Sequence, residues 1–282
     1  MKRLSIALLM ILVTAPFAYL ADDYNTLLDE DETAESTSQT YFVRLADPSI
    51  PQISAGQGFA CSLHLDTVKC WGYGGTGHLG YGNINSQSSP QLVQFGMLRY
   101  ATDISAGSDH VCAVMNDNSL YCWGQGQFGR LGSGNSDNFD TPNFVNFNNR
   151  FGLSNIAQDV ESGYSRTCSI LVWGNISCWG SNTYGALGLG IGGFGGDRLD
   201  PYEVSSLGAG RTAIDLSMGS GFSCALLDDG SVSCWGHNAY GQLGDADPNL
   251  VDKDIPTSIY PFGNNQIQLF VYSQSRLLFY CS

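Results

Sequence analysis

The sequence predicts an all-β protein built from four copies of one small unit. Two observations carry this prediction: a composition suited to turns and strands, and four segments that align with one another. The chain has 35 Gly, 14 Tyr and 14 Phe, and only 13% of its 282 residues are charged. This composition favours β structure and is unfavourable for long helices, which are rich in Lys and Glu.

The four segments share spaced glycines, two cysteines and a Cys-Trp-Gly triplet. They begin at Ile53, Ile104, Val160 and Leu216, and the second reads "ISAGSDHVCAVMNDNSLYCWGQGQFGRLGSGN". The first cysteines of the four segments are 51, 56 and 56 residues apart. A repeat of this length indicates an array of similar supersecondary units.

Each unit contains the pattern of a β-hairpin. In the fourth unit, "FSCALL" and "SVSCWG" flank "DDG", where Gly230 suits the positive φ of a three-residue turn. Cys224 and Cys234 are then opposite each other on the two strands. The second and third units keep the separation of ten residues, and the first shortens it to nine. We therefore expect opposed cysteines in all four hairpins.

Opposed cysteines in a secreted chain favour disulfide bonds, because directly opposed Cβ atoms lie at the distance a disulfide requires. The predicted bonds are Cys61–Cys70, Cys112–Cys122, Cys168–Cys178 and Cys224–Cys234. Zinc would need closer cysteine pairs or partner histidines. The four histidines fall at different places in the unit: His64, His78, His110 and His237. We predict no metal and no other cofactor.

A tryptophan follows the second cysteine of every unit, at Trp71, Trp123, Trp179 and Trp235. A large aromatic residue at one place in each unit is expected to form core between neighbouring units rather than to stack on a ligand. After a variable insert, each later unit is expected to begin at a proline: Pro90, Pro142 or Pro201, with Pro256 opening a fifth. The inserts are the expected binding loops.

Gly124, Gly126 and Gly129 have the spacing of a dinucleotide-binding loop, Gly-x-Gly-x-x-Gly. In the third and fourth units Asn182 and Asn238 replace the central glycine. Because Gly and Asn both tolerate positive φ, we expect this position to adopt it. The segment that follows Gly129, "RLGSGN", also breaks any helix that could hold a phosphate. The spacing therefore predicts a turn repeated in each unit.

The pattern "SAGxxHxCAL…G.V.CWGxNxxGQLG" resembles the repeat of the regulator of chromosome condensation family, over about residues 50–265. The resemblance implies a β-propeller, a fold shared by the secreted bacterial β-lactamase inhibitor protein II. Closed propellers of this family usually have seven blades. The chain supplies four clear units and a partial fifth, residues 266–282, in which Cys281 has no second cysteine.

We therefore expect an incomplete propeller, an open arc of blades. A fragment or interrupted reading frame and a diverged terminal cap both explain the partial unit. Ring closure protects the edge blades of a propeller, so an open arc is expected to associate with itself through its exposed blade edge.

Two segments precede the repeats. Residues 1–21 contain Lys2 and Arg3, an apolar run and then small residues, which is the pattern of a secretory signal peptide. An uncleaved membrane anchor is the alternative. Residues 22–49 are acidic and are expected to form a disordered tether. The protein is thus expected to be secreted, periplasmic or on the cell surface.

The net charge of −14 argues against nucleic acid and anionic membranes as partners. Motifs for a serine hydrolase, a zinc peptidase and a P-loop NTPase are absent from the sequence. Asp245, Asp247, Asp252 and Asp254 could hold Ca²⁺, but a solvated acidic loop is favoured because the ligand series is incomplete. We expect a binding module and no enzyme activity.

The expected partner is a protein or a glycan, bound through the variable loops. The resemblance implies an alternative, guanine-nucleotide exchange on a small GTPase. The signal peptide, the disulfides and the acidic charge oppose this alternative, because such GTPases are cytoplasmic. A second alternative is a lyase or hydrolase that works in a propeller funnel.

Overall fold

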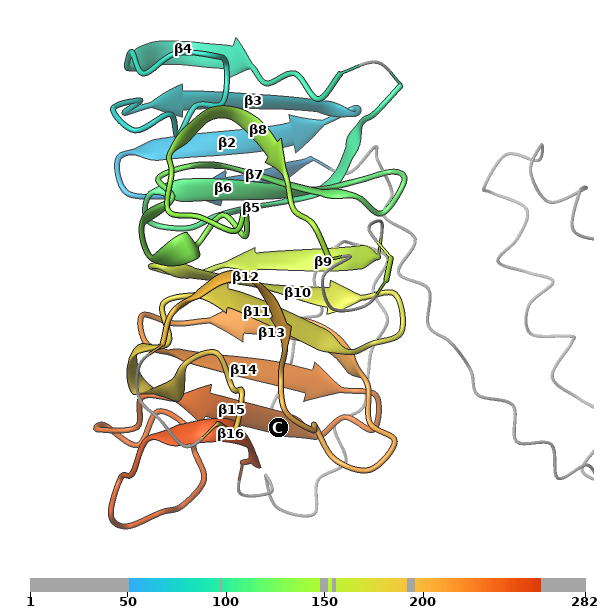
Figure 1. The fold of residues 1–282 in the computed structure, drawn as a ribbon, viewed down its shortest axis with the longest axis vertical. Helices are drawn as coiled ribbons and strands as arrows, with labels where there is room; N and C mark the ends of the chain where they lie inside the picture. Colours follow the sequence, from blue (N-terminus) through green and yellow to red (C-terminus); the bar gives the residue numbers. More distant parts are fainter. Residues whose placement is uncertain (1–50, 97, 148–151, 154–155, 192–195, 260–282) are drawn as a thin grey trace, which may run out of the picture. The chain divides into compact units, whose positions relative to one another are not determined.

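The computed structural model describes residues 51–96, 98–147, 152–153, 156–191 and 196–259, which form four antiparallel sheets of four strands (Figure 1). Each sheet is a meander whose strands pair in chain order. The first has β1 (Gln52–Ala55), β2 (Phe59–His64), β3 (Thr67–Gly72) and β4 (Gln87–Leu92). The second has β5 (Ala101–Ala106), β6 (His110–Met115), β7 (Leu120–Gly124) and β8 (Phe139–Phe144).

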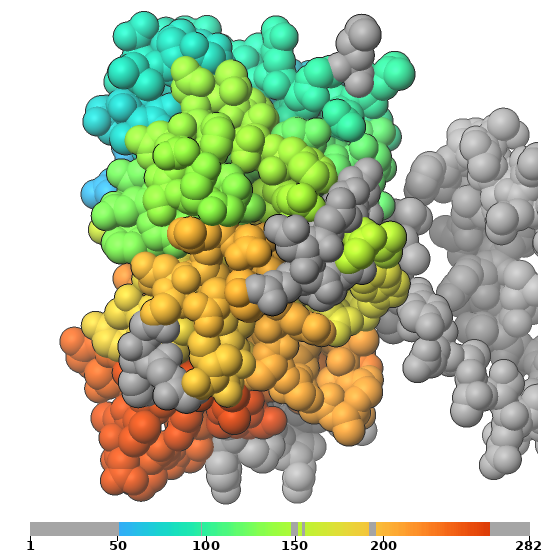
Figure 2. All heavy atoms as spheres, in the orientation of Figure 1, coloured from blue at the N-terminus to red at the C-terminus, as the bar shows by residue number. Residues whose placement is uncertain are grey.

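The third and fourth sheets repeat this plan. The third has β9 (Ala157–Ser162), β10 (Arg166–Leu171), β11 (Ile176–Gly180) and β12 (Arg198–Glu203). The fourth has β13 (Ala213–Met218), β14 (Phe222–Leu227), β15 (Val232–Gly236) and β16 (Lys253–Ser258). In Figure 2 the coloured atoms of the four blades run from blue at the top to red at the bottom. The prediction of an all-β array of four propeller-like blades is confirmed.

The predicted hairpins are the two middle strands of each sheet. Their register places the two cysteines opposite each other in every sheet, as in Cys224↔Cys234 and, across the shorter first turn, Cys61↔Cys70. Gly230 has the expected positive φ, 79°. The Sγ atoms of the four pairs lie 2.09 to 2.14 Å apart. The disulfides therefore join strand to strand within a blade.

The prediction that a proline opens each unit is wrong. Each proline lies in the last strand of its own sheet, and Pro256 belongs to β16 of the fourth blade rather than to a fifth. The four positions are Pro90 in β4, Pro142 in β8, Pro201 in β12 and Pro256 in β16. The physical reason is that some N–H groups of an edge strand have no partner in the sheet. Such a strand therefore tolerates proline, which has no backbone N–H.

Three apolar clusters join the blades in chain order. Each cluster combines the disulfide face of one blade with the tryptophan face of the next, as where Cys168 and Cys178 pack with Trp235. Trp123, Trp179 and Trp235 are fully buried. In the described part of the chain, none of these clusters joins the fourth blade to the first, so the array is open as predicted.

Each buried tryptophan also donates a hydrogen bond to the preceding blade. The Nε1 atom of Trp123 donates to the carbonyl of His78 at 3.0 Å, Trp179 to Arg130 at 3.0 Å and Trp235 to Ala186 at 3.1 Å. The acceptors occupy one position of the repeat. The tryptophans thus fix the register between blades as well as filling the core.

The first blade departs from this pattern. Trp71 is only partly buried, and no described residue accepts a hydrogen bond from its indole N–H. Ile53 is 65% exposed, whereas the equivalent Ile104 is 6% exposed. The expectation of a core tryptophan holds for three blades, because among the described residues only these pack against a preceding blade.

Several predictions concern residues outside the described ranges: the signal peptide at 1–21, the tether at 22–49, the partial repeat at 266–282 and Cys281. The described ranges contain no helix that is long and apolar enough to cross a membrane.

Candidate protein-binding face

The turns that join the first two strands of each blade and the long loops before the last strand emerge at the same end of the array. We call this the loop end, and it lies at the left of Figure 1. It comprises turns 56–58, 107–109, 163–165 and 219–221 and loops 73–86, 125–138, 181–191, 196–197 and 237–252. The loop end includes the predicted variable inserts.

The central position of the glycine motif does not adopt positive φ, contrary to prediction. Gly126 has a φ of −93° and Asn182 a φ of −103°. A Cβ at Gly126 would lie 1.8 Å from the Asp137 carbonyl oxygen, so the loop backbone requires glycine there. Asn182 instead accepts a hydrogen bond from the N–H of Leu187 at 3.1 Å. Glycine permits close approach in one blade, and asparagine caps the turn in another.

Positive φ falls instead on the first and last glycines of the motif and, in two blades, on the aromatic residue before the last glycine. Phe128 lies in the 3₁₀ turn η3 (Gln127–Gly129) with a φ of 66°, and Tyr184 lies in η4 (Thr183–Gly185) with a φ of 63°. Bulky residues rarely adopt this conformation. Both side chains reach the surface, as does the equivalent Tyr240 in the fourth blade. These residues were not among the predicted site residues, although an aromatic residue stands at this position in three of the four aligned units.

The aromatic residues of the third and fourth blades form a cluster. The ring of Tyr184 stacks on His237, with centroids 4.2 Å apart, and His237 meets Tyr240 edge-on at 6.1 Å. Gln242 lies 3.0 Å from Nδ1 of His237 and holds the imidazole in place. The loop end therefore presents a supported aromatic surface where these blades meet.

Beneath the loops, buried polar residues link neighbouring blades. His110 lies 2.8 Å from the Thr167 hydroxyl of the next blade, and Arg166 donates to the carbonyl of Gly219 at 2.9 Å. Burial lowers the pKa of His110 to about 3, helped by the nearby Arg130 cation, and burial lowers the pKa of Arg166 to about 10. No sequence motif indicated a role for Arg166. These contacts stabilise the blade junctions.

The Asp-rich loop of the fourth blade is organised by its own cation. Lys253 contacts Asp247 at 2.8 Å and Asp245 at 3.4 Å, and the pKa of Lys253 is raised chiefly by its hydrogen bond to Asp247. Asp252 accepts a hydrogen bond from the N–H of Asn238 at 2.7 Å. No group of three metal-ligating side chains occurs in the described residues. The carboxylates named here thus serve the loop structure.

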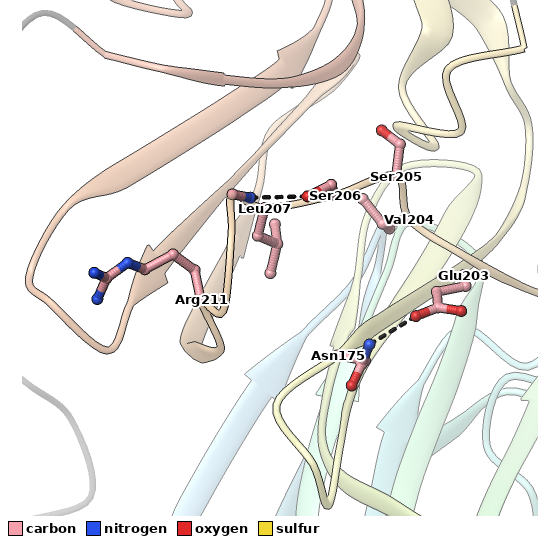
Figure 3. Close-up of a pocket in the computed structure, with 8 residues that line it drawn as sticks. Asn175, Glu203, Val204, Ser205, Ser206, Leu207 and Arg211 are labelled. Carbon is pink, nitrogen blue, oxygen red and sulfur yellow. Dashed lines mark hydrogen bonds between the residues drawn. The ribbon is translucent and has the colours of Figure 1, made fainter. Parts of the chain in front are cut away.

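A polar pocket of about 430 Å³ opens at the opposite end of the array (Figure 3). It is lined by Asn175, Glu203, Arg211 and residues 204–208. The Asn175 side chain donates to Glu203 at 2.6 Å, closing one side. Its lining contains no nucleophile paired with a base.

Comparison with known protein families supports the repeat assignment. The regulator of chromosome condensation (RCC1) repeat matches residues 67–114, 117–170 and 174–226, and a second form of the repeat matches 101–130 and 213–242. These matches cover more than half of the chain. It belongs to the RCC1 repeat family. The resemblance inferred from the cysteine, tryptophan and glycine pattern is thereby confirmed.

Similar RCC1-repeat proteins are larger than this chain. It is 29% identical over 219 residues to the ultraviolet-B receptor UVR8 of Arabidopsis thaliana, covering 77% of this chain and 48% of UVR8. It is 30% identical over 203 residues to the E3 ubiquitin-protein ligase HERC2 of Homo sapiens, covering 71% of this chain and 4% of HERC2. The chain thus spans about half of UVR8 and a small part of HERC2.

Solved structures show the same fold. Human WBSCR16 superimposes with a TM-score of 0.63 at 23% identity, covering 74% of this chain and 52% of that chain. Yeast RCC1 (Prp20), solved bound to Kap60, also gives 0.63 at 21% identity, covering 76% of this chain and 49% of that chain. These similarities support the propeller-like fold of this RCC1-repeat chain.

Proposed function

We propose that this RCC1-repeat chain is an interaction module of an oxidising compartment, which binds a protein partner through its loop end and catalyses no reaction. The observation that carries the proposal is that different parts of each blade form the packing contacts and the surface loops. Three of the four cysteine pairs and three of the tryptophans are used in blade packing, whereas the loops that differ between units emerge together at one end. Variable loops on a rigid frame are a common form of binding site.

Relatives support a protein partner. One yeast RCC1 structure was solved with Kap60, and another was described with binding to Gsp1p and histones. Residues 1–21 act as a signal peptide and 22–49 as a tether in this proposal, which places the blades outside the cytoplasm. Four cysteine pairs at bonding distance are compatible with that location.

Fractionation and thiol labelling of the full chain in its native host test the location. We expect the protein outside the cytoplasm, with eight cysteines protected from alkylation until a reductant is added. Recovery from the cytosol with all nine cysteines reactive would contradict the proposal. It would instead favour the exchange activity for which the family is named, which is measured as release of labelled GDP from a small GTPase of the same host.

We further propose that the exposed face of the first blade binds the fourth blade of a second copy. This face carries Ile53 and Trp71, whose equivalents in the other blades are buried against a preceding blade. The hydrogen-bond acceptor at the matching position of the fourth blade is the carbonyl of Gln242. Light scattering coupled to size-exclusion chromatography of the full chain tests this association.

A further inference from the structure

An aromatic residue recurs at one solvent-facing position of the repeat. Phe128, Tyr184 and Tyr240 each precede the last glycine of the motif in their blade, and they are 38%, 42% and 88% exposed. Packing between blades does not require an aromatic residue here, because Thr76 occupies the same position in the first blade. We call these three residues the aromatic row.

Two members of the row have a positive φ, which is unfavourable for residues with large side chains. Phe128 and Tyr184 lie in the left-handed region, where Gly or Asn would be less strained. Strained residues of this kind are often held in place by the surrounding structure at binding sites. A large ring kept at such a position, and partly exposed, points to a role beyond the turn.

The ring of Tyr184 is held in place by its neighbours. It stacks on His237, and its Cδ2 atom would lie 3.4 Å from a Cβ at Gly221 in the turn of the fourth blade. The Gln242 side chain in turn contacts His237. A ring held in this way loses little conformational entropy when a ligand stacks on it.

The turns and loops around the row are acidic. In the described residues they contain six aspartates and one arginine, Arg130, which is buried and contacts Asp109 at 3.4 Å. The aspartates are Asp109, Asp137, Asp197, Asp245, Asp247 and Asp252. Lys253 contacts two of them, while Asp137 and Asp197 are exposed. The field at the loop end therefore favours a cation.

We propose that the aromatic row binds a basic polypeptide segment whose arginine side chains stack on Tyr184 and Tyr240. Arginine combines a planar cation, which stacks on aromatic faces, with donors that suit carboxylates. The surface supplies both kinds of group. This inference deepens the proposed function, because it assigns a chemical class to the protein partner.

Binding of a labelled arginine nonapeptide to the purified, oxidised full chain tests the proposal at physiological salt. Phe128→Asn, Tyr184→Asn and Tyr240→Asn are combined in one variant, which keeps the net charge. We expect this variant to bind at least tenfold more weakly, within the range of cation–π energies. Its melting temperature is expected to stay the same or rise, because asparagine relieves the strain at two of the positions.

The matched control is Trp173→Asn, which removes an exposed aromatic side chain at the opposite end of the array. Wild-type affinity in this control supports the assignment to the aromatic row. If the triple variant bound the peptide as tightly as the wild type, the binding would be due to general charge attraction, and the proposal would be overturned. Preferential binding of a neutral oligosaccharide would do the same. Neither outcome depends on the cellular location measured for the proposed function.

Discussion

The first residue of the second strand of each blade shows how the blades accommodate different chemistry. It is occupied by Phe59, His110, Arg166 and Phe222 in the four blades. The two polar residues are buried, and each reaches the next blade, where Thr167 and the Gly219 carbonyl are within hydrogen-bond distance. Burying a polar side chain is tolerated when a partner is supplied. Each such pair therefore fixes the register of two blades.

His110 predicts a loss of stability in mild acid. The unfolded chain binds a proton near pH 6.5, whereas the folded His110 has a pKa of about 3 and stays neutral. Stability is therefore present above the unfolded pKa and is lost as pH falls below it. Between pH 7.5 and pH 5 the loss from this residue is about 2 kcal/mol. Urea unfolding at the two pH values measures it.

The matched variant is His110→Phe, the residue that two other blades use at this position. It removes the titrating group and leaves the contribution of His78, whose pKa is also lowered by burial. We expect the variant to lose about 2 kcal/mol of the pH dependence. An unchanged difference between pH 7.5 and pH 5 would show that His110 is protonated in the folded protein.

The tryptophans predict unequal effects of one substitution. Trp179→Phe removes a fully buried indole and its hydrogen bond to the Arg130 carbonyl, so we expect a loss of about 2 to 3 kcal/mol. Trp71→Phe changes a partly exposed residue with no such bond, and we expect less than about 1 kcal/mol. Denaturant unfolding of both variants tests the difference, and equal losses would contradict it.

Within each blade, the hairpin was the most predictable element. Its signals are local: two short apolar strands, a glycine turn and cysteines symmetric about the turn, as at Cys224 and Cys234. Strand register follows from turn length, so the opposed cysteines could be inferred without knowledge of the fold. The outer strands lacked such signals, and the prolines within them were misread as the beginnings of units.

The hairpin disulfides predict a moderate stabilisation each. Cys168→Ala together with Cys178→Ala opens a loop of sequence separation 10, and closure of such a loop contributes about 3 kcal/mol through the unfolded chain. We expect a loss of about that size in chemical unfolding at pH 7.5. The Cys224 and Cys234 pair of the fourth blade serves as a comparison, because none of the three apolar clusters includes it. A loss near zero would show that packing alone holds the hairpin.

The residues of the candidate site were less predictable than the strands and core of the blades. Three of the four tryptophans lie in the core as their periodic position indicated, but the exposed Phe128 and Tyr184 have no apolar periodicity that marks them. The conformation at Gly126 and Asn182 was predicted wrongly, because the choice there depends on how closely the neighbouring loop approaches. The backbone conformation at such positions depends on contacts between segments that are distant in sequence, and local propensity gives no information about these contacts.

The whole array is held by contacts of one repeating kind, each joining unlike faces of successive blades. Contacts between unlike faces can continue from one molecule to another. The first blade presents such a face at Ile53 and Trp71, and Gln242 and Gly244 of the fourth blade occupy the repeat positions that meet a tryptophan in the other blades. No tryptophan lies among the described atoms within 4 Å of a Cβ at Gly244, whereas Trp235 meets the equivalent Gly188.

Association of the chain should therefore depend on the first blade. Ile53→Asp places a charge on a side chain that is 65% exposed, so the fold is expected to survive while the contact between copies is weakened. Light scattering should give a mass above 30.3 kDa for the wild type and a mass near this value for the variant. Leu98→Asp, at a residue 96% exposed outside this face, should behave like the wild type. A monomeric wild type at high concentration would mean that the exposed face of the first blade does not recruit a second copy.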